Sequence, residues 1–141
     1  MPKVQPTWSL NDEADKMVTQ LVQRNPDLFS HIETARLGCA MVVGKEPADN
    51  QDWDAKISGI QEPEVMFSSK TYVLWFFEST WKKYTKAQRS AMLFRQLTRI
   101  TPDFDGKLLK EEHTCRLLAK AFGLDYIERQ DLPDLTEQKL S

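Results

Sequence analysis

The sequence predicts an α+β domain in which a small three-stranded sheet packs against an N-terminal helix and two C-terminal helices. Apolar residues repeat at helical spacing in three segments, and three short segments after the first of these are rich in apolar, β-branched or aromatic residues. The expected order is helix, three strands, helix, helix. With 141 residues, 40% of them hydrophobic and 28% charged, the chain has the size and composition of one globular domain spanning 1–141.

The N-terminal part predicts an unstructured lead and then one helix. Residues 1–8 contain Pro2 and Pro6, so the ordered core is expected to begin at about residue 8. Ser9 or Asn11 can cap the helix, because either side chain can accept a hydrogen bond from a first-turn amide. The apolar positions of this helix are Ala14, Met17, Val18, Leu21 and Val22, and Asn25-Pro26 ends it.

Three segments predict strands. Residues 37–43 are apolar and stop at Gly44, residues 55–61 alternate weakly, and residues 71–78 are rich in Tyr, Val, Trp and Phe. The polar residues 45–54 predict a loop. Because Leu74 and Phe76 alternate with Trp75 and Phe77, one of these pairs is expected to face away from the main core and to offer a patch for a partner.

Two helices are expected to follow. Thr85 can cap a main helix over 86–100, which Thr101-Pro102 ends, and Gly123 can cap a last helix over 107–122. The inward face of the main helix is expected to hold Ala87, Ser90, Ala91, Phe94 and Leu97. The ordered core is expected to stop near residue 124, with a loosely attached acidic tail over 125–141.

Charge is unevenly distributed along the chain, although the net charge is only −2. Residues 80–100 contain six basic residues and no acidic one, whereas residues 124–141 contain five acidic and two basic ones. The acidic parts can cover the basic helix, which is the interpretation we favour, or the helix can offer a basic face to an acidic partner. The candidates for partner binding are Lys82, Lys83, Lys86, Arg89, Trp75 and Trp81.

Cysteine content and hydropathy favour a cytoplasmic protein. Cys39 and Cys115 are far apart and form no Cys-x-x-Cys pair, which fits a reducing compartment. The first residues lack the apolar stretch of a signal peptide, and no apolar run approaches the length of about 18 residues that a membrane span needs. No Gly-rich phosphate loop is present. We therefore expect no cofactor and no membrane partner, while the oligomeric state stays open.

The segment Thr71 to Phe94, which contains Trp81-Lys82-Lys83-Tyr84, resembles the lead into the active-site helix of the putative phage metallopeptidases, small SprT-like zincins. In that family a His-Glu-x-x-His motif follows directly, and a Gly-Lys-Leu turn and a final Phe-Gly-Leu lie downstream. This chain reads Arg95-Gln96-Leu97-Thr98-Arg99 at the motif, then Gly106-Lys107-Leu108 and Phe122-Gly123-Leu124. The resemblance covers roughly residues 8–125 and implies a minimal zincin-like fold in a degenerate member.

The resemblance places the two helix ligands at Arg95 and Arg99, the catalytic glutamate at Gln96, and the third ligand at Lys110 with Glu111 beside it. Arginine stays protonated near neutral pH and cannot ligate zinc, and an amide cannot act as a general base. The expectation is therefore no metal and no catalytic residue.

Two interpretations of this cluster stay open. Glu111 can pair with an arginine and tie the last helix to the main helix, or the cluster can be an open anion site. His113 is a candidate displaced ligand, although helical geometry points it away from the core.

The expected function is a catalytically inactive metallopeptidase-like protein of phage or prophage origin that binds and occludes a host protein. A host defence complex of the CRISPR type is one candidate target, by analogy only. The first alternative is nucleic-acid binding through the basic helix 81–99, against which the overall acidity weighs. The second alternative is a remnant metal-dependent hydrolase using His113 and nearby acids, which would lose activity to chelators.

Overall fold

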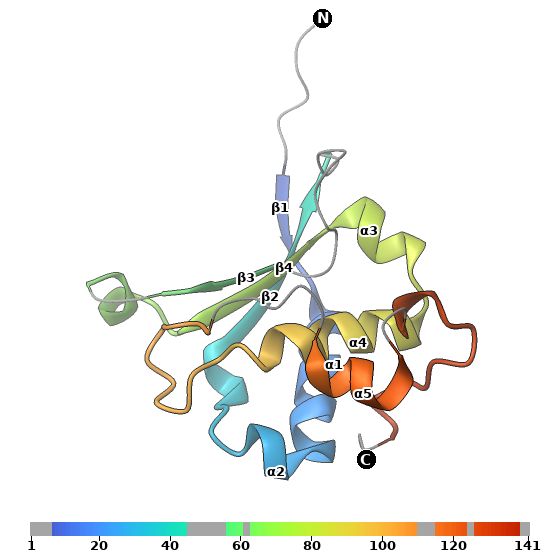
Figure 1. Ribbon diagram of the computed structural model, residues 1–141. Helices are drawn as coiled ribbons and strands as arrows, with labels where there is room; N and C mark the ends of the chain where they lie inside the picture. Colours follow the sequence, from blue (N-terminus) through green and yellow to red (C-terminus); the bar gives the residue numbers. More distant parts are fainter. Residues whose placement is uncertain (1–6, 45–55, 61–62, 110–114, 124–125, 139–141) are drawn as a thin grey trace, which may run out of the picture.

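The computed structural model describes residues 7–44, 56–60, 63–109, 115–123 and 126–138 (Figure 1). It confirms the α+β class, with a mixed sheet and five helices among these residues. The strands are β1 (Thr7–Leu10), β2 (Leu37–Val43), β3 (Lys56–Gly59) and β4 (Tyr72–Phe77); the helices are α1 (Asp12–Arg24), α2 (Pro26–Phe29), α3 (Glu78–Lys83), α4 (Lys86–Leu97) and α5 (Arg116–Phe122). The sheet therefore has four strands, and the prediction of three is wrong.

The sheet has the order β1-β2-β4-β3, with the central pair β2 and β4 parallel and both edge strands antiparallel to their neighbours. The unpredicted strand is β1, in which Thr7 and Trp8 were expected to belong to an unstructured lead and Ser9 was a candidate helix cap. Its residues Thr7-Trp8-Ser9-Leu10 alternate polar and apolar, but four residues next to Pro6 give a weak signal. Pairing with β2, in which Trp8 lies opposite Val42, supplies the stabilisation that local sequence does not show.

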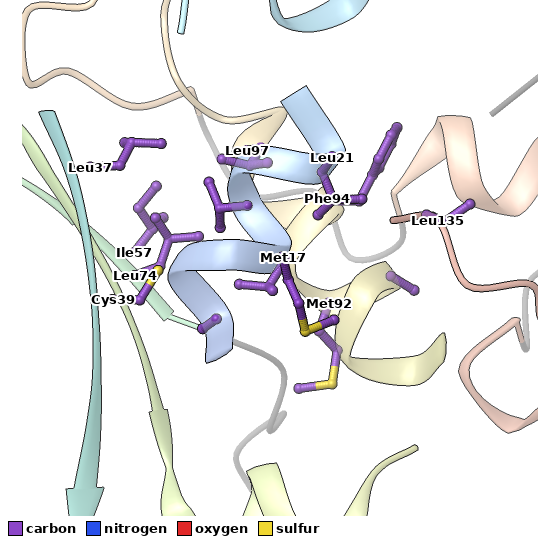
Figure 2. Packing of buried hydrophobic residues seen from close by; sticks show 14 of the residues in the cluster. Met17, Leu21, Leu37, Cys39, Ile57, Leu74, Met92, Phe94, Leu97 and Leu135 are labelled. Carbon is purple, nitrogen blue, oxygen red and sulfur yellow. The ribbon is translucent and has the colours of Figure 1, made fainter. Parts of the chain in front are cut away.

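Helices α1, α4 and α5 lie on one side of the sheet (Figure 1). One hydrophobic cluster fills the space between these layers, and Figure 2 shows the sheet residues Leu37 and Leu74 facing the helices, with Met17 of α1 between them and Leu135. Tyr72, Leu74 and Phe76 all point into this cluster and are at most 1% exposed. The alternation of β4 thus puts Trp75 and Phe77 on the opposite face, as expected from the period of a strand.

The helix boundaries follow the capping residues. Asn11 caps α1 by accepting a hydrogen bond from the Ala14 amide at 3.1 Å, and Asn25 closes it. Thr85 caps α4 in a full capping box, in which its side chain accepts from the Gln88 amide and the Gln88 side chain accepts from the Thr85 amide. These caps confirm the predicted starts of both long helices.

Three predictions for the C-terminal half are wrong. The sequence Ser79-Thr80-Trp81 predicts the opening of a turn after the strand over 71–78, but residues 78–83 form α3. The last helix is shorter than the predicted 107–122, because Leu108 makes a β-bridge with Ile100 and α5 begins only at Arg116. Residues 126–138 were placed in a loose tail, yet Tyr126, Leu132 and Leu135 are buried in the core cluster. Few apolar residues stand among the acidic residues of this segment, so the sequence shows no periodic pattern that would place them in the core.

The turn after α4 is fastened to the sheet by Tyr72. The Tyr72 hydroxyl donates to the Lys107 carbonyl at 2.7 Å and accepts from the Gly106 amide at 3.0 Å. Gly59 of β3 approaches the same turn so closely that a Cβ atom there would lie 1.8 Å from the Gly106 carbonyl oxygen. This contact needs glycine, since a side chain would push the turn away from the sheet.

Gly59→Ala should therefore lower the free energy of unfolding by about 1–3 kcal/mol, because the added methyl group overpacks a backbone contact. Chemical denaturation measures this change. Gly38→Ala is the matched control, because a Cβ atom there would make an ordinary contact of 3.6 Å with the flexible Lys70 side chain. Equal stability of the two variants would contradict the proposed contact between Gly59 and the turn.

Candidate functional site

The motif residues 95–99 span the end of α4, with Arg95 to Leu97 in its last turn and Thr98 and Arg99 just after it. Every residue from Ser90 to Leu97 is buried, so the inward face is wider than the stripe that the sequence predicted. Arg95 is 7% exposed and Gln96 is fully buried, whereas Arg99 just after the helix is half-buried. A permanent charge at a position as closed as Arg95 is unusual and indicates a specific structural or binding role.

Arg99 holds the chain that leads to the predicted third ligand. Its Nε donates to the Leu109 carbonyl at 3.1 Å, and its own carbonyl accepts from the Leu109 amide at 2.7 Å. One of its terminal nitrogens also donates to the Gln96 side-chain oxygen at 3.3 Å. The structure thus brings Arg99, Gln96 and Leu109 together and fastens the end of α4 to the segment that precedes Lys110.

Lys110, Glu111 and His113 lie outside the described residues. The predicted pairing of Glu111 with an arginine, the open anion site and the displaced-ligand role of His113 therefore stay predictions. The contacts of Leu109 show only that the chain enters this region beside Arg99.

The family resemblance implies a zinc ion here, and the described donor atoms do not fit one. Arginine offers only N–H donors, and a fully buried amide is a poor substitute for a carboxylate base. Among the described residues, no group of three or more His, Cys, Asp or Glu side chains could hold a metal ion. His31, which lies among the described residues, contacts the Ile100 carbonyl at 3.2 Å and so supports the chain just after α4.

The buried thiol of Cys39 is a poor nucleophile. Burial raises the pKa of this thiol far above its ordinary value, and the nearby charge of Asp15 raises it further. A thiol that stays protonated at neutral pH cannot attack a substrate. Cys115 is also buried and precedes α5. Both cysteines thus have a structural role in the core.

The basic face predicted for partner binding is largely neutralised by acidic side chains. Lys86 lies 3.3 Å from Asp134, Lys82 lies 3.3 Å from Glu78, and Arg89 lies 3.1 Å from Glu13. Lys83 is exposed at the end of α3. Of these three pairs, that of Lys86 uses the acidic C-terminal segment, whereas Glu78 and Glu13 belong to α3 and α1.

Trp81 is not available at the surface, although the sequence made it a candidate. It is 5% exposed and packs edge-on against Phe76, with ring centroids 4.6 Å apart. The guanidinium of Arg89 lies 4.5 Å from the Trp81 ring centroid, and the Arg89 Nε donates to the Trp81 carbonyl. Both residues thus fasten α3 to α4.

Aromatic and apolar side chains gather on the outer face of the sheet, and the sequence predicted only Trp75 among them as a candidate for partner binding. Trp75 is half-buried there and packs edge-on against Trp8, which is 59% exposed. Leu10 on the same strand is 80% exposed. The Asn11 amide donates to the Cys39 carbonyl, so these two residues form a hydrogen-bonded pair at the end of the β1–β2 ladder. Hydrogen-bonded and non-hydrogen-bonded pairs alternate along an antiparallel ladder. The backbone N–H and C=O groups of Trp8 and Leu10 therefore point away from β2. We call Trp8, Leu10 and Trp75 the outer edge.

Comparison with known proteins identifies one family. Residues 6–125 match the model of the family described as "Putative phage metallopeptidase". No curated protein and no solved structure matches the chain. No helix of the described residues is long and apolar enough to cross a membrane.

Arg99→Ala should lower the free energy of unfolding by about 1.5–3 kcal/mol, because it removes charge-assisted hydrogen bonds to Leu109 and Gln96. Thermal and chemical unfolding measure this effect. Lys83→Ala removes an equally charged but exposed side chain and should change stability by less than about 0.5 kcal/mol. If both variants were equally stable, the fastening role of Arg99 would be refuted.

Proposed function

The chain belongs to the putative phage metallopeptidase family, and from this membership we propose that it is a catalytically inactive member that binds and occludes a protein of the host. In this proposal α4 carries the remains of the motif helix, with Arg95 and Arg99 in the places of the two histidines. Gln96 stands in the place of the catalytic glutamate. The protein would be encoded by a phage or prophage.

The observation that carries this proposal is the buried guanidinium of Arg95 in the last turn of α4, followed by the half-buried Arg99 just after the helix. A divalent cation beside the 7% exposed guanidinium of Arg95 would meet repulsion in a region of low dielectric constant. The amide of Gln96, already accepting from Arg99, could not take a proton from water. These side chains support a binding role far better than metal-assisted hydrolysis.

The outer edge is the surface best suited to a protein partner. Aromatic residues dominate the energetics of protein interfaces, and Trp8 combines a large exposed ring with an edge strand whose outward backbone groups can pair with another chain. Lys82 and Lys83 on α3 are further exposed candidates. A host protein covering this edge would be held in place, and its own binding surface would be blocked.

Nucleic-acid binding gains no support from the charges. The ion pairs of Lys82, Lys86 and Arg89 reduce the positive potential that phosphates would need. A host protein, with a defence complex of the CRISPR type as one candidate by analogy, therefore stays the proposed partner.

A tagged pull-down from host lysate, with and without nuclease, tests the proposal. The wild-type chain should retain a stoichiometric host protein after nuclease treatment. Trp8→Ala should weaken capture at least about 30-fold, as expected for a truncated interface hot spot. Lys16→Ala, an exposed change on α1, should leave capture unchanged.

Two results would overturn the proposal. Recovery of nucleic acid alone, lost at raised salt, would establish the nucleic-acid alternative. Peptide hydrolysis by the wild-type chain that chelators abolish would establish a metal-dependent hydrolase.

A further inference from the structure

The C-terminal segment packs against the helices although it lies beyond the family match. The match ends at residue 125, and the structure describes the segment 126–138 as a run of short turns. Leu135 is fully buried and enters the core cluster from the side opposite the sheet (Figure 2). The segment therefore behaves like a bound peptide that happens to be part of the same chain.

Residues 134–137, Asp-Leu-Thr-Glu, make backbone contacts typical of a bound peptide. The Leu135 amide donates to the Ser90 hydroxyl at 3.0 Å in a buried contact, and the Ser90 hydroxyl donates to the Ala87 carbonyl at 2.6 Å. The Arg24 Nε donates to the Thr136 carbonyl at 3.3 Å. Ser90 of α4 and Arg24 of α1 thus hydrogen-bond to the backbone on both sides of the Leu135 side chain.

Both acidic residues of the segment lie beside one lysine of α4. Lys86 lies 3.3 Å from Asp134 and 3.7 Å from Glu137. Burial alone would raise the pKa of Asp134, but hydrogen bonds from Thr136 and Lys86 outweigh this effect and lower it. The carboxylate is therefore the stable form of Asp134 in the docked segment, which matches the basic surroundings.

We infer that the surface formed by Arg24, Lys86, Ser90 and the buried site of Leu135, which we call the tail groove, is a binding site for an acidic leucine-containing peptide of a partner protein. The chain's own residues 134–137 occupy it in cis. The recognised pattern is an acidic residue, leucine, any residue and a second acidic residue. This inference goes beyond the proposed function, since Trp8 and Trp75 of the outer edge lie on the face of the sheet opposite Leu74, which packs in the core cluster with α4.

The segment can leave the groove without the rest of the tail. Gln88 donates to the Ile127 carbonyl at 2.7 Å, and Arg129 donates to the Phe122 carbonyl at 2.7 Å. These contacts hold residues 126–129 independently of Asp134 and Leu135. The exposed ion pairs of Lys86 contribute little, so the leucine and its backbone bonds supply most of the affinity.

A labelled peptide with the sequence of residues 130–138 tests the groove in the full-length chain. The docked tail competes at an effective concentration on the order of millimolar, so binding to the wild type should be weak. Leu135→Ala weakens the competitor but leaves the groove intact. Fluorescence anisotropy should show the peptide binding this variant at least about 30-fold more tightly than the wild type.

Two controls make the measurement specific. The same peptide with alanine in place of Leu135, and with Leu132 kept, should bind the Leu135→Ala chain at least about 30-fold more weakly than the native peptide. Adding Lys86→Glu to the Leu135→Ala chain should weaken native-peptide binding at least threefold, about 0.7 kcal/mol, by reversing the charge complementarity. Absence of native-peptide binding to a folded Leu135→Ala chain would overturn the inference.

Hydrogen exchange on the wild-type chain tests the inference without any variant. The Leu135 amide should exchange at least about tenfold faster than the Phe94 amide in the middle of α4, because local release opens the groove without global unfolding. Equal protection of both amides would overturn the inference. A dimeric wild-type chain that becomes monomeric on Leu135→Ala would also overturn it, because the occupant would then be the tail of a second copy.

Discussion

The burial of α4 is the constraint on which the rest of the structure depends. Its residues from Ser90 to Leu97 are all buried, so the sheet and α1 must cover one side and the C-terminal segment another. This demand explains why Leu135 belongs to the core even though it lies in an acidic tail. It also explains why the turn after α4 is fastened by Tyr72 and Arg99: the segment has to close the end of the helix.

The same burial defines the chemistry of the site. Arg95 in the last turn of α4 and Arg99 just after it make this end of the helix a cationic, hydrogen-bonded corner, whereas a metal site needs neutral or anionic ligands. The chain shares the family's sequence pattern over residues 6–125, and the side chains at the end of α4 determine which chemistry is possible there. The exposed aromatic and apolar side chains of the outer edge, Trp8 and Leu10, lie away from this corner.

The main elements could be predicted because their signals are local. The caps Asn11 and Thr85 and the β-rich segment of β4 determine structure within a few residues. The misses depend on contacts between distant segments. Strand β1 exists because β2 offers a partner, and Leu135 is buried because Ser90 and the core receive it. Likewise Trp81 looked like a surface aromatic until α3 folded it against Phe76.

The central claim is that this chain holds no zinc ion at the end of α4, and a zinc titration of the purified wild-type chain tests it most directly. Isothermal calorimetry followed by metal analysis should show no stoichiometric zinc binding, because the ligand positions carry guanidinium groups. One tightly bound zinc ion per chain would contradict the claim, because the ligands would then have to come from other residues.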